Sequence, residues 1–253
     1  MVDQTVAALR AAGCVFAEDE ARLLHAAADD PAGLAALLAR RVAGEPLEHV
    51  LGWASFHGLR IAVTPGVFVP RPRTEFLVDL AAGLARPGAL VVDLCCGSGA
   101  LGAALVAVVP GARVHAADVD PVAVRCARRN LPDHQVYQGD LTEPLPTSLR
   151  GKVDLMVANV PYVPTAEVAL LPPEAREHEP LRALDGGTDG LDLLRRVATL
   201  APAWLAPGAH LLIETSTRQA PTAAEAFRTA GLRPEVAESA DFGATVVIGA
   251  MQN

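Results

Sequence analysis

Residues 91–102 read Val-Val-Asp-Leu-Cys-Cys-Gly-Ser-Gly-Ala-Leu-Gly, and this stretch decides the fold. Its apolar start is typical of a buried strand, and the glycines after it are typical of a turn that opens a helix. Gly97, Gly99 and Gly102 match the G-x-G-x-x-G pattern, in which glycines let the backbone approach a ligand at a helix N-terminus. The pattern alone is weak evidence, because glycine is also frequent in tight turns that bind nothing.

Two carboxylates make the nature of the ligand more specific. Asp93 ends the strand before the glycine loop, and Asp118 follows the next expected strand, 112–117, where a ribose-binding acid is expected. Asp93 would repel the pyrophosphate of a dinucleotide, which disfavours the alternative of a nicotinamide-dependent oxidoreductase. S-adenosylmethionine carries an ammonium and a sulfonium that suit Asp93 and a ribose that suits Asp118. We therefore predict S-adenosylmethionine as the cofactor.

Composition limits the class of protein. The chain has 253 residues, 51% of them hydrophobic and 20% charged, which predicts a soluble globular protein of one large domain or two smaller ones. The net charge of −8 argues, though weakly, against a nucleic-acid partner. The four cysteines show neither a C-x-x-C pair nor zinc spacing, so we expect reduced thiols and no metal. The first residues lack the features of a signal peptide, and we expect a cytoplasmic monomer that does not enter the membrane.

The chain is expected to divide into three parts. Residues 1–52 show apolar residues at helical spacing and predict a small helical domain, a plausible substrate-docking module. Residues 53–72 predict a β-hairpin with a two-residue turn, followed by a proline-rich linker. Residues 73–253 alternate strand and helix patterns, which is typical of an α/β domain with a mainly parallel sheet.

The α/β part predicts a seven-stranded sheet. Strands are expected at 89–94, 112–117, 134–138, 153–158, 209–214, 233–238 and 243–249, and helices at 73–85, 99–108, 120–130, 188–205 and 219–230. The gap between the last two strands is too short for a helical crossover, so these strands should pair antiparallel. Such a Rossmann-like sheet is the usual fold of class I S-adenosylmethionine-dependent methyltransferases.

Polar residues follow four of these strands, where ligands of open α/β sheets bind. They are Asp93, Asp118, Asp140 and Asn159. Asp140 could accept the exocyclic amine of adenine, with Leu141 and Val119 on either face of the ring. Each one alone could be a turn residue or a helix cap, and Asp118 or Asp120 could cap the helix at 120–130. Together they predict a cofactor site formed by Asp93, Cys95, Cys96, Gly97, Ser98, Gly99, Asp118, Val119, Asp140, Leu141 and Asn159.

The tetrapeptide Asn159-Val160-Pro161-Tyr162 is the expected place of the chemistry. An amide nitrogen is a poor nucleophile because its lone pair is delocalised into the carbonyl. The side-chain oxygen of Asn159 and the carbonyl of Val160 could orient an NH2 group, and the ring of Tyr162 could stack on a planar substrate. The alternative is an Asn-initiated turn stiffened by proline.

Four segments of the chain resemble the HemK-type protein-(glutamine-N5) methyltransferases. They are Gly44-Glu45-Pro46-Leu47 with Gly52 and Phe56; residues 68–75, similar to a P-R-P-E-T-E segment; residues 159–162, similar to an N-P-P-Y motif; and residues 179–192. The last segment, with Glu179-Pro180 and two glycine-rich turns, is the most specific of the four. The N-P-P-Y motif alone also occurs in adenine-N6 and other amino methyltransferases.

The resemblance implies transfer of a methyl group from S-adenosylmethionine to the side-chain amide of a glutamine in a protein. The Gly-Gly-Gln loop of a peptide-chain release factor is the first candidate, a ribosomal protein glutamine the second and a nucleic-acid adenine the third. A relative that binds S-adenosylmethionine without catalysis is a further alternative. The implied catalytic residues are Asn159, Pro161 and Tyr162. The implied substrate-binding residues are Asn159, Val160, Pro161, Tyr162, Phe68 and Arg71.

Four departures from the family pattern mark a divergent member. Val160 stands where the first proline is usual, which removes that residue's fixed φ. Arg73 replaces a glutamate, and Cys95-Cys96 replaces Gly-Thr at the opening of the cofactor loop, where we expect the bulkier Cys95 to shift the backbone path. The stretch 241–245 lacks the arginine usual near the last hairpin.

Overall fold

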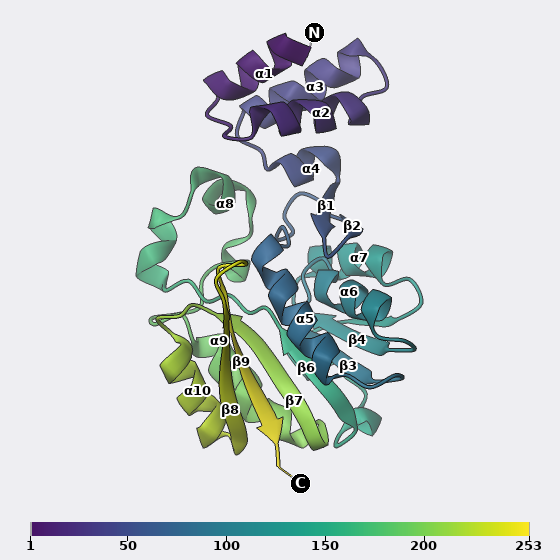
Figure 1. Cartoon of the computed structure of the whole chain (residues 1–253), viewed down its shortest axis with the longest axis vertical. Coiled ribbons are helices and arrows are strands. Elements are labelled where there is room, and N and C mark those ends of the chain that lie inside the picture. Colours follow the sequence, from purple (N-terminus) through teal and green to yellow (C-terminus); the bar gives the residue numbers. More distant parts are fainter. Residues whose placement is uncertain (1, 253) are drawn as a thin grey trace.

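The computed structural model describes residues 2–252, and its N-terminal part is a bundle of short helices (Figure 1). These are α1 (Val2–Ala11), α2 (Ala17–Ala27), α3 (Pro31–Val42) and α4 (Leu47–Leu51). The Asp30 side chain caps α3 by accepting a hydrogen bond from the Gly33 N–H at 2.7 Å. Leu9, Leu24 and Val50 belong to an apolar cluster separate from the two clusters that cover the large sheet.

A two-stranded hairpin and a linker follow the bundle. Strands β1 (Trp53–Phe56) and β2 (Leu59–Ala62) pair antiparallel. The two turn residues, His57 and Gly58, have φ of 49° and 72°, as in the two-residue turns whose twist suits a hairpin. The linker then enters the 3-10 helix η1 (Pro72–Thr74) and helix α5 (Glu75–Leu84).

The remainder forms a seven-stranded sheet in the order β5-β4-β3-β6-β7-β9-β8, with β9 antiparallel to both neighbours and the other pairs parallel. The strands are β3 (Leu90–Leu94), β4 (Arg113–Asp118), β5 (Gln135–Gln138), β6 (Val153–Ala158), β7 (Leu205–Thr215), β8 (Leu232–Ser239) and β9 (Ala244–Met251). The predicted fold class and the antiparallel end of the sheet are confirmed.

Helices cover both faces of the sheet (Figure 1). They are α6 (Ala100–Val108), α7 (Pro121–Asn130), α8 (Pro173–His178), α9 (Asp192–Leu200) and α10 (Ala220–Thr229), with 3-10 turns η2 (Thr147–Leu149), η3 (Thr165–Leu170), η4 (Leu181–Ala183) and η5 (Ala201–Ala203). Helices α5, α6 and α7 share one apolar cluster with the sheet, and α9 and α10 share the other. Alternate residues of the central strand divide between these clusters, since Val91 faces one and Val92 the other.

The prediction of one helix over 188–205 is wrong. The helix α9 is shorter, and a separate 3-10 turn follows it. Gly190 has φ of 77°, a left-handed conformation that a continuing helix cannot contain, and β7 already begins at Leu205. The other expected strands and helices of the sheet domain start and end within three residues of the observed ones, except that β7 begins four residues early. Residues 1 and 253 of the expected parts lie outside the described residues.

Within residues 2–252, no helix is both long and apolar enough to span a bilayer. The uncharged stretch 94–112 instead forms the glycine loop and the buried helix α6. That helix packs among the apolar residues of the core and leads directly away from the end of β3.

Candidate active site

The strand order reverses between β3 and β6, so the loops that leave these two strands run in opposite directions. A cavity of about 950 Å³ lies at this edge of the sheet, within the size range of small-molecule sites. Most predicted site residues line it: Cys95, Cys96, Gly97, Ser98, Asp118, Val119, Asp140, Leu141, Asn159, Val160, Pro161, Tyr162, Phe68 and Arg71. Asp93 and Gly99 are not among the lining residues and lie behind the glycine loop.

The glycine loop is held in place by Asp118. The Gly97 N–H donates to Asp118 Oδ2 at 2.9 Å. Gly99 has φ of 77° at the N-terminus of α6, and a Cβ there would lie 3.1 Å from the Ala127 Cβ of helix α7. The glycine is therefore needed both for the turn and for the close approach of α7.

Asn130, at the end of α7, ties the glycine loop to the hairpin, a role that the sequence pattern did not indicate. Its Nδ2 donates to the Ser98 carbonyl at 2.8 Å and to the Ala62 carbonyl at 2.9 Å, while its Oδ1 accepts from the Ala62 N–H at 2.8 Å. One side chain thus fixes the loop relative to β2.

Cys95 and Cys96 occupy the opening of the loop without disrupting it. Cys95 has φ of 54°, so the backbone adopts there the left-handed conformation that a glycine adopts readily. The Cys96 N–H still donates to the Ala117 carbonyl at 3.1 Å. Burial raises the pKa of both thiols, which therefore line the cavity as neutral groups.

Asp93 is almost fully buried at 1% exposure. Its Oδ2 accepts from the Gly102 N–H at 3.0 Å, and its Oδ1 has no partner among the described residues. Burial raises the pKa of Asp93 to about 7, with a smaller contribution from the nearby Asp118. The interaction with a cationic ligand that the sequence suggested stays a prediction.

Asp118 places its carboxylate inside the cavity, while its neighbour Asp120 performs the capping. Asp118 Oδ1 accepts from the Asp120 N–H at 2.8 Å, and Asp120 Oδ1 accepts from the Val122 N–H at 2.7 Å at the start of α7. The alternative in which Asp120 caps the helix is therefore confirmed. Burial raises the pKa of Asp118, although the two backbone N–H groups that it binds oppose this.

Asp140, Leu141 and Val119 lie where an adenine ring was expected. Asp140 Oδ2 accepts from Arg196 of α9 at 2.6 Å, a contact that the sequence did not indicate. Leu141 is buried and has φ of 49°, whereas Val119 is 53% exposed. The three side chains share the cavity wall, and the adenine contact stays a prediction.

Asn159 directly follows β6, and a neighbour from the linker orients its side chain. Asn159 Nδ2 donates to the Oγ1 of the buried Thr74 at 3.3 Å. Since the amide nitrogen faces Thr74, the Asn159 Oδ1 is the atom left to accept a hydrogen bond from a ligand. Thr74 belongs to the segment that resembles P-R-P-E-T-E, so the sequence held an indication of its importance.

The rest of the tetrapeptide is firmly packed. Val160 is 1% exposed, and the backbone at Tyr162 is fixed because Gln219 Nε2 donates to the Tyr162 carbonyl at 2.9 Å. Burial, and to a lesser extent Glu214, raise the pKa of Tyr162 to about 12, so the phenol stays neutral at physiological pH. Val160 thus stands in a loop that packing already restrains.

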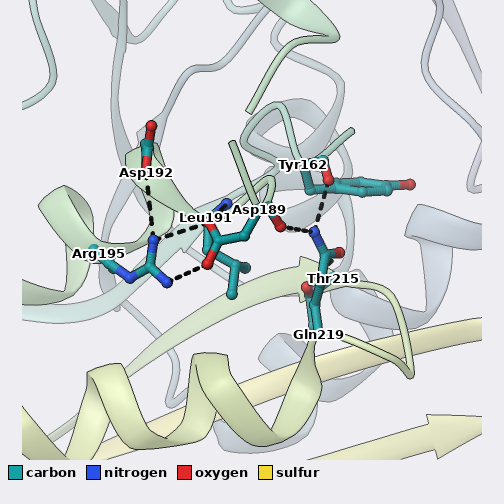
Figure 2. A network of polar contacts seen from close by, with 7 residues as sticks. All are labelled: Tyr162, Asp189, Leu191, Asp192, Arg195, Thr215 and Gln219. Atoms are coloured by element: carbon teal, nitrogen blue, oxygen red, sulfur yellow. Dashed lines mark hydrogen bonds and ion pairs between the residues drawn. The ribbon is translucent and has the colours of Figure 1, made fainter. Parts of the chain in front are cut away.

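A glycine-rich turn supports the same loop from below (Figure 2). Gln219 Nε2 also donates to the Asp189 carbonyl at 2.9 Å, and Arg195 binds the Asp189 carboxylate. A Cβ on Gly190 would lie 2.2 Å from the Tyr162 carbonyl oxygen and 2.4 Å from Gln219 Nε2. The stretch 186–190 can therefore contact the tetrapeptide only because these positions lack side chains.

Phe68 and Arg71 form the wall on the linker side. Arg71 donates to Glu179 Oε2 at 2.6 Å, and its guanidinium lies 4.8 Å from the centre of the Phe68 ring. Glu179 is buried and also accepts from the Val69 N–H at 3.1 Å. These contacts join the linker to the crossover between β6 and α9, and the substrate contacts of Phe68 and Arg71 stay a prediction.

The residues of the cavity fit S-adenosylmethionine. Asp118 and Asp140 present carboxylates to it, and the unpartnered oxygen of Asp93 lies just behind the loop. Such a set suits a ligand that combines hydroxyl groups, an amine and positive charge. When bound, S-adenosylmethionine supplies an electrophilic methyl group. The fold and this site together define a class I S-adenosylmethionine-dependent methyltransferase.

Comparison with known proteins identifies the family. Residues 59–171 match the model described as "Methyltransferase small domain". A methyltransferase from Pyrococcus furiosus shares the fold with a TM-score of 0.59 at 16% identity, over 78% of this chain and 90% of that one. A release factor glutamine methyltransferase of Geobacter sulfurreducens is 42% identical over 77% of this chain and 69% of its own length. The chain belongs to the release factor glutamine methyltransferase family.

One relative of similar identity is named for another acceptor. The 4-amino-L-phenylalanine/4-methylamino-L-phenylalanine methyltransferase of Streptomyces pristinaespiralis is 40% identical over 76% of this chain and 68% of its own length. Family membership therefore leaves the acceptor to be argued from this chain's own site.

The first prediction concerns Asp93 and pH. A folded-state pKa raised from 3.8 to about 7 means that the folded protein binds the extra proton, so stability is lost as pH rises through this range. One pKa unit corresponds to about 1.4 kcal/mol, so ionisation of Asp93 costs a few kcal/mol of folding free energy. Asp93→Asn should gain stability relative to the unaltered protein between pH 5 and pH 8, as measured by urea unfolding. Parallel pH profiles for the two proteins would contradict this.

The second prediction concerns Gly190. Gly190→Ala should push the Tyr162 carbonyl away and lower methyl-transfer activity, because Cβ would overlap that oxygen. Gly13→Ala is the matched control, since Gly13 also has positive φ, 89°, but its Cβ would meet nothing within 4 Å. Both changes carry backbone strain of about 1 kcal/mol. Equal activity of the two variants, measured at saturating S-adenosylmethionine, would show that the turn does not support the tetrapeptide.

Proposed function

We propose that this protein methylates the side-chain amide nitrogen of a glutamine in a protein, using S-adenosylmethionine. The Gly-Gly-Gln loop of a peptide-chain release factor is the first candidate substrate. The observation that carries the proposal is the orientation of Asn159, whose amide nitrogen is bound by Thr74 so that its oxygen is available in the cavity beside Tyr162. Family membership supports the same acceptor.

The proposed roles follow from the chemistry of an amide nitrogen. Asn159 Oδ1 and the Val160 carbonyl accept hydrogen bonds from the two N–H groups of the acceptor. This turns the nitrogen toward the methyl donor and stabilises the positive charge that develops on it. The ring of Tyr162 stacks on the planar amide and, with the buried Val160, excludes water from the reacting atoms. Asp118 binds the cofactor and takes no part in methyl transfer.

The N-terminal helices have a place in this proposal. The three parts expected from the sequence, 1–52, 53–72 and 73–253, are proposed as docking module, connection and catalytic domain. The separate apolar cluster of α1 to α4 supports a module that can present its own surface to a large substrate. We further propose that the protein acts as a cytoplasmic monomer, because its proposed substrate works in translation and the lining of the cavity is drawn from one chain.

A second candidate acceptor is the aromatic amine of a free amino acid. The relative named for 4-amino-L-phenylalanine favours it. Its nitrogen is also conjugated to a planar group, so the same acceptor pair and stacking ring could serve. The two candidates differ in size, since only a protein substrate would need the helical module.

A competition between acceptors tests the proposal. The purified protein is incubated with methyl-labelled S-adenosylmethionine and a release factor, a release factor whose loop glutamine is changed to alanine, or 4-amino-L-phenylalanine. We expect label only on the first, at the glutamine nitrogen by mass spectrometry. Label on the amino acid alone would establish the second candidate. Label on ribosomal protein or on DNA would point to the other planar amines, and no label anywhere would favour a binding-only protein.

The third prediction separates chemistry from binding. Asn159→Ala should lower kcat by about 10²–10³-fold, the usual cost of losing one oriented polar contact at the reacting centre, and leave cofactor affinity unchanged. Asp118→Ala should do the opposite and raise the KM for S-adenosylmethionine. Calorimetry gives the affinities and a labelled-methyl assay gives the rates. An Asn159→Ala enzyme with unaltered kcat would refute the assignment of Asn159.

A further inference from the structure

A buried carboxylate that the proposed chemistry does not use lies next to the tetrapeptide. Glu214 is near the end of β7, one residue beyond Ile213, which pairs with Ala158 of β6. It is 1% exposed, and its Oε2 has no partner among the described residues. An uncompensated charge at such a depth is costly, so the partner of the other oxygen decides what Glu214 does.

That partner is Arg73, the residue that departs from the family pattern. Arg73 Nε donates to Glu214 Oε1 at 3.0 Å, and Arg73 Nη2 donates to the Tyr162 hydroxyl. The hydroxyl in turn donates to the same Glu214 oxygen at 3.4 Å. The guanidinium also lies 5.8 Å from the centre of the Tyr162 ring. The three side chains therefore form a closed set of contacts.

The two ends of the tetrapeptide are thus held by consecutive linker residues. Thr74 binds the side chain of Asn159, and Arg73 binds the side chain of Tyr162. The next residue, Glu75, fixes this segment by accepting from the His57 N–H at 2.8 Å. Because Arg73 lines the cavity with its side chain 44% exposed, this arrangement is at the surface that an acceptor would touch.

We infer that Arg73 is a positioning residue that uses the buried Glu214 as a fixed base to hold the ring of Tyr162 against the methyl acceptor. The inference rests on the proposed function for the identity of the acceptor, but the contacts that it concerns exist without one. A glutamate in place of Arg73 would face Glu214 with like charge and could not make this bridge. The structure therefore gives the unusual arginine a role.

A purely structural role for Arg73 gives a different expectation. Removing one partner of a buried ion pair destabilises a protein, whereas replacing both with apolar residues often restores stability. If Arg73 only neutralises Glu214, the double change should restore activity as well as stability. If Arg73 positions Tyr162, stability should return without activity, because the hydroxyl loses both contacts.

The test uses Arg73→Met, Arg73→Lys and the double variant Arg73→Met/Glu214→Leu, with Arg86→Met as the matched control. Arg86 pairs with Asp154 at 2.7 Å, is 78% exposed and does not line the cavity. We expect Arg73→Met to lose stability and to lower kcat by roughly 10- to 100-fold, the range for a displaced positioning group. Cofactor affinity should stay unchanged. Lysine should give an intermediate kcat, because it keeps the charge but not the planar fork.

The double variant should recover the melting temperature and keep the low kcat. Recovery of both, or an unaltered kcat in Arg73→Met, would overturn the inference. A measurement without any acceptor separates this inference from the proposed function. The chain has two tyrosines, so the ring-carbon NMR signals of labelled Tyr137 and Tyr162 can be followed separately. Arg73→Met should shift the Tyr162 signal and leave Tyr137 unaltered, and an unshifted Tyr162 signal would overturn the inference whatever the substrate proves to be.

Discussion

The reversal of strand order between β3 and β6 is the constraint on which the site depends. Where all crossovers run in one direction, each loop is covered by the next helix. Here the glycine loop after β3 and the tetrapeptide after β6 leave the sheet on opposite sides, so a crevice remains between them. Cofactor contacts from one loop and acceptor contacts from the other can therefore face the same cavity.

Loops at such a crevice need support, and segments distant in sequence provide it. Thr74 orients Asn159, Gln219 binds the Tyr162 carbonyl, and Asn130 binds the glycine loop at Ser98. Each support is a single polar side chain that satisfies backbone or amide groups, and these groups would otherwise be buried without partners. The site is consequently rigid although none of its reacting groups lies within a strand or helix.

The two deeply buried carboxylates near the cavity are treated differently. Asp93 has no cation nearby and keeps its proton to near pH 7 because of burial. Glu214 has Arg73 at 3.0 Å, and the pair together also binds Tyr162. The departures from the family pattern at Arg73 and Cys95 are therefore accommodated locally, by a new ion pair in one case and by a left-handed residue in the other.

The sequence by itself determined the sheet, its antiparallel end and the strand ends that carry Asp118, Asp140 and Asn159, because these depend on local periodicity and on connection length. It misplaced the helix before β7, since the conformation of Gly190 depends on contacts with Tyr162 and Gln219. Only the tertiary structure showed that Thr74, Asn130 and Gln219 support the loops, and that Arg73 meets Glu214 across 141 positions of sequence. Contacts of this kind leave no local pattern, because they arise only when the sheet brings its carboxyl edge and the linker together.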